Sequence, residues 1–289
     1  MTIAGPVIRP PSEAGSFLLQ VTLGCSANQC SFCGAYTGKT FGIKPREEVL
    51  EDIRKQKEED AGVRRVFLLD GDALAVRNNG LIPVLRELDK AFPALTRVAS
   101  YANGFNITLR SREELKELRE NKLSLIYIGL ESGSQKVLNA CGKRSGVDEM
   151  VEAVGKAEEA GIKSSVMVLL GLGGERLAEE HVQETVKALN RMQPRYLSFL
   201  SLMFVPGTPL FEEAARGEFK RLGPVALLEQ ARDILAGLDM KRTVFRTDHA
   251  SNYISLEGRL PKDKERLLRE LEAGIKGDTD LRAEWARGL

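Results

Sequence analysis

Residues 16–33 have the sequence SFLLQVTLGCSANQCSFC, an apolar run followed directly by three cysteines. Cys25, Cys30 and Cys33 are separated by gaps of four and two residues, and the chain holds only four cysteines in all. Three thiolates on a tight loop after a strand can hold a soft metal centre, either iron–sulfur or zinc. The fourth cysteine, Cys141, lies far downstream, so the triple leaves one coordination position open unless the fold returns Cys141 to it.

Three other interpretations of the cysteine triple fit less well. Met1–Gly15 lacks a basic segment followed by an apolar stretch, so a reducing cytoplasm is expected and a disulfide is disfavoured. Structural zinc sites use two paired hooks, and the chain has no second hook. The C-x4-C-x2-C spacing also matches plant-type ferredoxins, but there the fourth ligand should follow within the same small domain. The pattern therefore favours an iron–sulfur site with three protein ligands.

Length and charge limit the class of protein. The 289 residues can form one barrel-sized domain or two ordinary ones. Lys and Arg number 42 against 41 Asp and Glu, a net charge of +1, which does not suggest a nucleic-acid-binding surface or an anionic-membrane patch. No apolar run approaches the ~20 residues that span a bilayer. We therefore expect a cytoplasmic protein without a membrane or nucleic-acid partner.

Strands and helices are expected to alternate along most of the chain. Six mostly apolar runs are predicted to be strands, at residues 16–24, 64–69, 96–101, 123–130, 163–170 and 196–202. Helices are predicted between them, including residues 46–60, 81–91, a helix capped by Ser111, 147–160 and 177–192. Strands this continuous in apolar residues are covered on both faces, which indicates a parallel sheet with helices outside. The pattern predicts one α/β domain, either a barrel or a doubly wound sheet.

The pattern changes after about Pro206. The remaining chain is predicted to be mainly helical, with one short strand at residues 243–246 and helices at residues 210–215, 224–238 and 262–275. We expect three parts: an irregular lead-in at 1–15, a core at 16–210, and an α-rich cap at 211–289 that covers the substrate face.

Several motifs follow the predicted strands directly. They are the cysteine loop, Asp70-Gly71-Asp72, Glu131-Ser132, Gly171–Glu175 and Phe204–Thr208. In a parallel α/β fold the carboxyl ends of the strands lie on one face, where ligands and catalytic groups gather. Glycines there let a ligand approach the backbone, and acidic groups accept hydrogen bonds from an amine or from ribose hydroxyls. Together these motifs predict a metal cluster beside a nucleoside-like ligand.

From about Phe17 to Leu210 the chain resembles the radical S-adenosylmethionine (radical SAM) superfamily. Phe32, the aromatic residue just before Cys33, fits the pattern of that superfamily. The segments GLESGS (129–134) and VPGTPLFEE (205–213) are most similar to its elongator-subunit-like, methylthiotransferase-like and coproporphyrinogen-oxidase-like branch. The resemblance implies a partial (β/α)6 TIM-like barrel with the α-rich tail as its C-terminal cap.

The resemblance also implies cofactors and a reaction. Members hold a [4Fe–4S] cluster with three cysteines, here Cys25, Cys30 and Cys33, and S-adenosyl-L-methionine (SAM) chelates the fourth iron. An electron from a low-potential donor of flavodoxin or ferredoxin type passes through the cluster. It splits SAM into methionine and a 5′-deoxyadenosyl radical, which acts on a small-molecule substrate. The substrate itself is not indicated by any part of the sequence.

Further cofactor-binding residues follow from matching positions. Asp70-Gly71-Asp72 stands where the family often has Gly-Gly-Glu against the methionine amine, and Glu131, followed by Ser132, would contact the SAM amine or ribose. The turn Gly171, Gly173 and Gly174 would line the adenine pocket, and Phe32 is a further cofactor-binding candidate. Two departures are visible: the first cysteine gap is four residues where the family usually has three, and the acidic triplet is not Gly-Gly-Glu.

Other candidate residues have weaker signals. His249 lies in the polar segment Thr247–Tyr253, which is either a capped turn or part of a substrate pocket, and its imidazole could move a proton. His181 is expected on the surface of its helix. Cys141 is either a buried small hydrophobe or a thiol that returns a hydrogen atom. Arg176 occupies the third glycine position of a dinucleotide fingerprint, which disfavours a Rossmann site at Gly171.

Two non-enzymatic alternatives remain open from the sequence. A haem-handling chaperone of the same fold would bind the cluster and SAM without cleaving SAM. A simple iron–sulfur electron carrier would not bind SAM at all. The cysteine loop and the strand-end motifs together favour the enzyme.

Overall fold

The computed structural model describes residues 3, 5 and 7–288; the parts of the expected lead-in at residues 1, 2, 4 and 6 lie outside the described residues. The chain divides into two compact units. The units have the bounds Met1–Asn28, Ala35–Ile128 and Glu152–Ser164 for the first, and Gln29–Gly34, Gly129–Val151 and Ser165–Leu289 for the second. The division places Cys25 in the first unit and Cys30 and Cys33 in the second.

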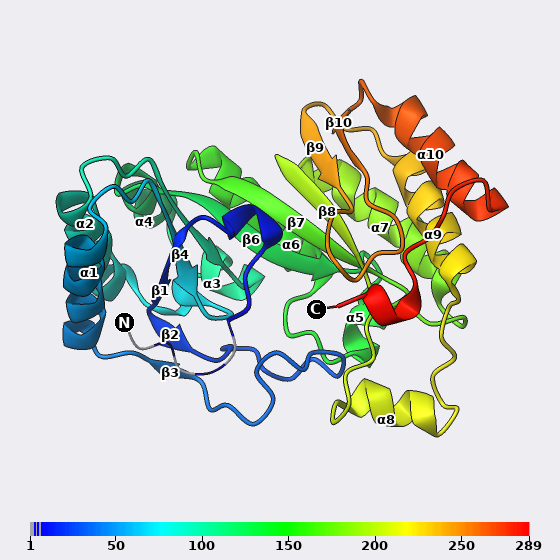
Figure 1. Cartoon of the computed structure of the whole chain (residues 1–289), viewed down its shortest axis with the longest axis horizontal. Coiled ribbons are helices and arrows are strands. Elements are labelled where there is room, and N and C mark those ends of the chain that lie inside the picture. Colours follow the sequence, from blue (N-terminus) through cyan, green and yellow to red (C-terminus); the bar gives the residue numbers. More distant parts are fainter. Residues whose placement is uncertain (1–2, 4, 6, 289) are drawn as a thin grey trace. The chain divides into compact units, whose positions relative to one another are not determined.

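Parallel strands form the centre of the first unit. Their order is β1-β4-β5-β6, with bounds Phe17–Gln20, Arg65–Leu69, Arg97–Tyr101 and Leu123–Glu131. The last three residues of β6 belong to the second unit. Four of the five residues of β4 are fully buried, as the continuous apolar run predicts. The helices of this unit are α1 (Arg46–Glu59), α2 (Asn78–Ala91), α3 (Gly104–Thr108), α4 (Arg112–Glu120) and the last part of α6 (Val147–Glu159). Figure 1 shows α1 and α2 side by side, next to these strands.

The first predicted strand is divided in two. Residues 16–24 were expected to be continuous, but β1 ends at Gln20, and β2 (Thr22–Leu23) pairs antiparallel with β3 (Gly42–Ile43). The backbone N–H of Lys44 donates to the carbonyl of Val21, at 3.0 Å. The segment after the cysteine loop therefore pairs with the residues just before Cys25.

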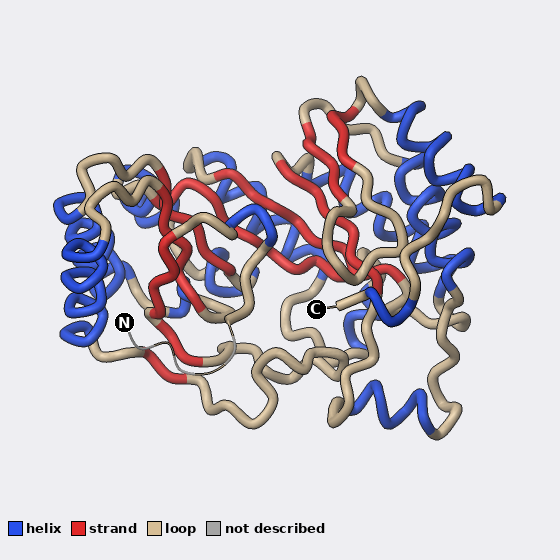
Figure 2. Tube along the Cα trace, viewed as in Figure 1, coloured by secondary structure: helices blue, strands red, loops and turns tan. Residues whose placement is uncertain are grey.

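The second unit contains β7 (Lys163–Leu170, whose first two residues belong to the first unit), β8 (Tyr196–Ser201), β9 (Thr243–Arg246) and β10 (Glu257–Leu260). The strand β8 pairs parallel with β7 and with β9, whereas β10 is antiparallel to β9. Its helices are α5 (Gln135–Ala140), the start of α6, α7 (Ala178–Met192), α8 (Pro209–Ala215), α9 (Pro224–Gly237) and α10 (Lys264–Lys276). Figure 2 shows β8, β9 and β10 as neighbouring strands with α9 and α10 beside them.

The C-terminal tail is more than a set of helices. The three predicted helices and the strand at 243–246 are present as α8, α9, α10 and β9, but β10 was not predicted. Because β9 pairs with β8, the tail extends the strands of the second unit. The predicted boundary at residue 210 falls inside α8. That the tail covers a substrate stays a prediction.

Local signals in the sequence placed several helix ends well. Ser111 and Glu114 form a reciprocal capping box at the start of α4. Gly161 follows α6 with a φ of +80°, the left-handed conformation expected at a helix end.

None of the helices in the described part of the chain combines the length and apolar composition that a membrane-spanning segment needs.

Candidate functional site

The triplet Asp70-Gly71-Asp72 directly follows β4 and contacts the residues around Cys25 within the first unit. Its first carboxylate, on Asp70, accepts hydrogen bonds from the backbone N–H of Gly24, at 2.9 Å, and from Gln20, at 3.1 Å. The backbone N–H of Gly71 donates to the carbonyl of Gly24, at 3.1 Å. The start of the cysteine loop is therefore fixed by the end of β4.

Asp72 is the acceptor at the centre of a buried polar network. Its Oδ2 atom accepts from Ser26 Oγ at 2.5 Å, from Asn103 Nδ2 at 2.9 Å and from Asn106 Nδ2 at 2.5 Å. Burial raises the pKa of Asp72 above its usual value, and the hydrogen bonds from these three side chains oppose the rise. The Asn103 amide also reaches the Sγ atom of Cys25, at 3.7 Å. Both carboxylates of the triplet thus have protein partners; their predicted contact with the methionine end of SAM stays a prediction.

The second half of the cysteine loop belongs to the second unit. The backbone N–H of Ser31 donates to the carbonyl of Cys141 at the end of α5, at 2.8 Å, and the N–H of Leu210 donates to the carbonyl of Ser31, at 3.0 Å. A further bond from the N–H of Cys33 to the carbonyl of Cys30, at 3.1 Å, closes a turn. The pair Cys30 and Cys33 is therefore held between α5 and α8.

A largely buried ion pair lies at the end of β6. Glu131, the last residue of β6, has a φ of +63°, and its Oε1 atom is 3.2 Å from Lys143 Nζ. The two side chains are only 17% and 11% exposed. Burial lowers the pKa of Lys143, but the charges of Glu131 and Cys30 outweigh it, so the net shift is upward. Burial raises the pKa of Cys30 to about 12, against the opposing effect of Lys143. A carboxylate, an ammonium and a thiol thus influence one another at this position.

The turn after Glu131 is fixed by α7. Ser132 Oγ is hydrogen bonded to His181 Nδ1 at 2.8 Å, and the backbone N–H of Gly133 donates to Thr185 Oγ1 at 2.9 Å. The expectation that His181 lies on the surface is wrong, because its side chain is fully buried on the inner face of α7. Burial lowers the pKa of His181 to about 4, so the ring is neutral near pH 7.

The predicted glycine turn follows β7 and is closely packed. A Cβ added at Gly174 would lie 2.8 Å from the carbonyl oxygen of Lys220 and 3.1 Å from the Phe219 ring, so only glycine permits this approach. Within the second unit, a cavity of about 470 Å³ opens here, lined by α5, by residues 172–177 and by the segment after α8. Its lining residues include Gly173 and Gly174 from the predicted set.

Cys141 and Phe32 belong to one apolar cluster. Cys141 is buried with Val137, Leu169, Leu172, Leu202 and Leu210, and Phe32 packs against this group. Burial raises the pKa of Cys141 to about 11, and its Sγ donates weakly to the carbonyl of Leu138, at 3.4 Å. These surroundings are those of a small hydrophobe. Cys141 also lines the cavity beside the glycine turn.

The polar segment Thr247–Tyr253 connects β9 to β10 and is attached to the end of β8. Asn252 donates to the carbonyl of Phe199 at 2.7 Å and accepts from Ser201 Oγ at 2.9 Å. His249 is partly buried, and its Nδ1 accepts from the backbone N–H of Ser251 at 3.1 Å. Burial lowers the pKa of His249. The segment thus lies at the carboxyl end of β8; a role for His249 in catalysis stays a prediction.

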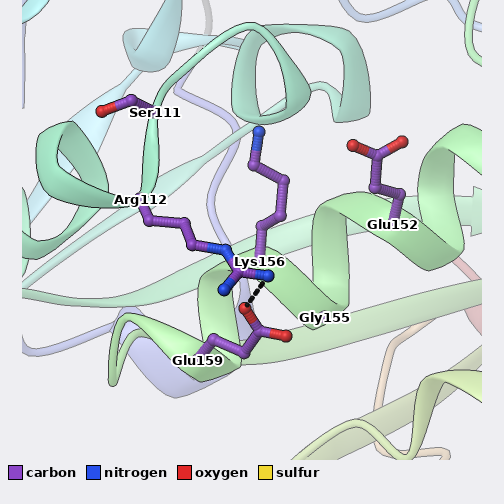
Figure 3. A pocket seen from close by; sticks show the side chains of 6 residues that line it. All are labelled: Ser111, Arg112, Glu152, Gly155, Lys156 and Glu159. Atoms are coloured by element: carbon purple, nitrogen blue, oxygen red, sulfur yellow. Dashed lines mark ion pairs between the residues drawn. The ribbon is translucent and has the colours of Figure 1, made fainter.

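A second hollow, in the first unit, has a different character. It lies between the start of α4 and α6, and Figure 3 shows it spanned by the ion pair of Arg112 and Glu159, at 3.0 Å. Its other cation, Lys156, donates to the backbone carbonyls of Thr108 and Arg110. Arg112, Glu159 and Lys156 thus already have partners within the chain.

Comparison with known proteins places the chain in a family. The sequence model of the Radical SAM superfamily matches residues 19–189, so the chain belongs to that superfamily. Its relatives include a putative methylthiotransferase of Methanocaldococcus jannaschii, 26% identical over 149 residues, which are 48% of this chain and 32% of the relative. The first three curated relatives are matched over only 41%, 42% and 32% of their own length.

Two solved structures share the fold. Coproporphyrinogen III oxidase of Escherichia coli, described as a radical SAM enzyme, aligns with a TM-score of 0.57 at 15% identity, over 76% of this chain and 51% of that protein. The archaeal Elp3 of Methanocaldococcus infernus aligns with a TM-score of 0.54 at 14% identity, over 92% and 64%. The predicted fold class, a TIM-barrel-like α/β fold of mostly parallel strands, is therefore confirmed, as is membership of the superfamily. The similar proteins include one of each kind that the sequence resembles: a methylthiotransferase, a coproporphyrinogen oxidase and an elongator subunit.

The residues of the loop suit the cluster that the family implies. Cys25, Cys30 and Cys33 take part in no disulfide, and each is partly exposed. Thiolates are the protein ligands of [4Fe–4S] clusters, and hydrogen bonds to their sulfurs adjust the redox potential. Among the described residues no three Cys, His, Asp or Glu side chains gather around a point that one metal ion could occupy; in a [4Fe–4S] cluster each cysteine binds a different iron.

Sequence reasoning missed several residues of the site. Asn103 follows β5 in the same way that Asp70 follows β4, so the strand-end rule would have found it. Lys143 carries no such signal, because it lies in an irregular stretch after α5 and meets Glu131 only through the fold. His181 and Thr185 are four residues apart on α7, a spacing that fits one helix face but does not predict a buried polar contact.

Proposed function

We propose that the protein is a radical SAM enzyme. It binds a [4Fe–4S] cluster through Cys25, Cys30 and Cys33 and reductively cleaves SAM to act on a small-molecule substrate. The observation that carries the proposal is the buried pair of Glu131 and Lys143, which is electrostatically coupled to Cys30. Membership of the superfamily supports the cluster and the cofactor.

The ion pair suits the amino-acid end of SAM. That end carries an ammonium and a carboxylate, so it presents one charge of each sign to a site that also holds one of each. Glu131 would accept from the ammonium and Lys143 would donate to the carboxylate. Before the ligand arrives the two side chains neutralise each other, which avoids an uncompensated buried charge. When the zwitterionic end of SAM enters, Glu131 and Lys143 would each exchange the other for a group of SAM. No charge would then be left unpaired.

Other residues would orient the rest of the cofactor. Ser132 and Gly133 are fixed by α7, so the backbone that carries Glu131 is held before the ligand binds. Phe32 and the glycine turn would lie along the adenosine. When bound, the cluster supplies the single electron that breaks the sulfur–carbon bond of SAM. The protein's own part is to bind, orient and exclude water from the products.

The direct test is the cleavage of SAM. The protein is reconstituted anaerobically with iron and sulfide, mixed with SAM and dithionite, and analysed for 5′-deoxyadenosine by chromatography. The proposal predicts 5′-deoxyadenosine that depends on dithionite and is lost in Cys30→Ala. Cys141→Ala is the matched control, because it removes a thiol that lies outside the cysteine loop. Loading of a cluster without any 5′-deoxyadenosine would contradict the enzymatic proposal and favour a non-catalytic binding protein.

A further inference from the structure

The acidic triplet after β4 has a second role that its contacts define. We propose that Asp70-Gly71-Asp72 clamps Cys25 and that Asn103, oriented by this clamp, donates an N–H hydrogen bond to the Cys25 sulfur when it ligates the cluster. The inference rests on the proposed function, since it concerns one ligand of the same cluster. It makes Asn103 a positioning residue that acts through Cys25.

The clamp holds the backbone on both sides of Cys25. Before it, Gly24 is bound twice, by the Asp70 carboxylate at 2.9 Å and by the N–H of Gly71 at 3.1 Å. After it, Ser26 donates its hydroxyl to Asp72 at 2.5 Å. Both carboxylates are buried, because Asp70 is only 1% exposed and Asp72 is 0% exposed. These hydrogen bonds are therefore shielded from water. The residue between the two anchors has little freedom to shift.

The middle residue of the clamp faces the thiol itself. A Cβ added at Gly71 would lie 2.9 Å from the Cβ atom of Cys25 and 3.3 Å from its Sγ atom. The same added Cβ would lie 2.8 Å from the Tyr36 ring, so there is no space for a side chain at position 71. Glycine at this position therefore lets the end of β4 pack directly against Cys25. A residue with a side chain at position 71 would not fit this arrangement.

The orientation of the Asn103 amide follows from its acceptor. Nδ2 is 2.9 Å from Asp72 Oδ2, and a carboxylate oxygen accepts hydrogen bonds, so the NH₂ group and not the carbonyl must point this way. The backbone N–H of Asn103 also donates to Asp72 Oδ1, at 3.3 Å. One amide hydrogen is used by Asp72, and the other lies between two acceptors, Ser26 Oγ at 3.3 Å and Cys25 Sγ at 3.7 Å. Because Ser26 already donates its own hydroxyl to Asp72, we infer that a cluster-bound Cys25 thiolate becomes the stronger acceptor for this hydrogen.

This hydrogen bond has a defined effect on a cluster. Reduction by one external electron adds negative charge, part of which resides on the sulfur ligands. An N–H donor stabilises that charge, so it makes the reduction potential less negative. It also holds the ligand in place, and the loss of such outer contacts typically weakens metal binding by about 10- to 100-fold.

The chain provides a matched control for the test. Asn106 donates to the same Asp72 oxygen at 2.5 Å and approaches the same Ser26 hydroxyl at 3.4 Å. Of the two amides, only that of Asn103 reaches the Cys25 sulfur. The full chain is reconstituted as wild type, Asn103→Ala and Asn106→Ala. The midpoint potential is measured by a dithionite titration with redox mediators followed by electron paramagnetic resonance, and the loss of iron to a chelator is timed.

The inference predicts a more negative potential for Asn103→Ala and a loss of iron about tenfold faster than in wild type. Asn106→Ala keeps the wild-type potential. Asn103→Ala could fail to hold a cluster while Asn106→Ala takes up as much iron as wild type. In that case the difference in iron content, and not the potential, supports the clamp. Equal potentials in wild type and Asn103→Ala, or equal changes in both variants, would overturn the inference. A wild-type protein that takes up no cluster would instead contradict the proposed function.

Discussion

Lys143 Nζ lies 3.2 Å from Glu131 Oε1, and both side chains are largely buried. Glu131 ends a strand in the left-handed conformation, with a φ of +63°, which is uncommon for a residue with a side chain. Strained backbone of this kind is concentrated at functional sites. The arrangement keeps two opposite charges beside Cys30, where the amino-acid end of SAM is proposed to bind.

Removal of either charge should weaken SAM binding. Glu131→Gln and Lys143→Gln each lose a hydrogen bond to a charged group, which costs on the order of 1.5–3 kcal/mol, or about ten- to a hundredfold in affinity. The dissociation constant is measured by anaerobic titration of the reconstituted protein. Lys136→Gln is the control, because Lys136 belongs to an exposed ion pair with Glu180. Unchanged SAM affinity in both buried variants would remove the pair from the site.

The buried His181 should make stability depend on pH. The pKa of its imidazole is about 4 in the folded protein, against an ordinary value of 6.5. The unfolded chain therefore binds more protons between these values, and the contribution of His181 is complete above pH 6.5 and lost as the pH falls towards 4. The shift corresponds to about 3 kcal/mol of unfolding free energy. Denaturant unfolding across this range should show a smaller pH dependence for His181→Gln; an identical dependence would contradict the shift.

Two residues of the polar segment between β9 and β10 should have different roles, one in stability and one in turnover. Asn252→Ala leaves the buried carbonyls of Phe199 and Thr247 without their donor, so we expect a loss on the order of 1–3 kcal/mol in unfolding free energy. His249→Ala should cost less, because His249 is only partly buried, and should leave SAM affinity unchanged while lowering turnover. Denaturant unfolding and SAM titration of the two variants provide the comparison. Weaker SAM binding in His249→Ala would be evidence against a substrate-side role.

The cysteines should differ sharply in their effect on the cluster. Cys25→Ala, Cys30→Ala and Cys33→Ala each remove one of the three proposed ligands, so the absorbance of the reconstituted cluster should be lost. Cys141→Ala should retain it, since Cys141 is packed among apolar side chains. Iron and sulfide are quantified in all four variants. Loss of the cluster in Cys141→Ala would replace the open three-ligand site with a closed four-thiolate one.

Much of the fold was predictable because burial leaves a simple pattern. The strands β4, β5, β7 and β8 were placed to within two residues, since each is a continuous apolar run between polar or glycine residues. Helix caps such as the one at Ser111 were also visible, because their contacts are local in sequence.

The features that were missed depend on contacts between distant residues. The break after Gln20 depends on the pairing of β2 with β3, beyond the cysteine loop. The strand β10 is only four residues long, and two of these are charged, so no apolar run marks it. His181 has charged neighbours in sequence, and only its contact with Ser132 explains its burial. The cysteine ligands were accessible to sequence reasoning because their spacing is itself the signal; Lys143 and Asn103 were identified through their structural contacts.

Cys25, Cys30 and Cys33 are proposed to hold a cluster whose fourth iron binds SAM. This proposal is tested most directly by electron paramagnetic resonance of the dithionite-reduced, reconstituted protein, recorded with and without SAM. We expect a [4Fe–4S]⁺ signal whose g-values change when SAM is added, because SAM would coordinate the iron that lacks a cysteine. A spectrum that SAM leaves unchanged, from a protein that holds a full cluster, would contradict the proposal.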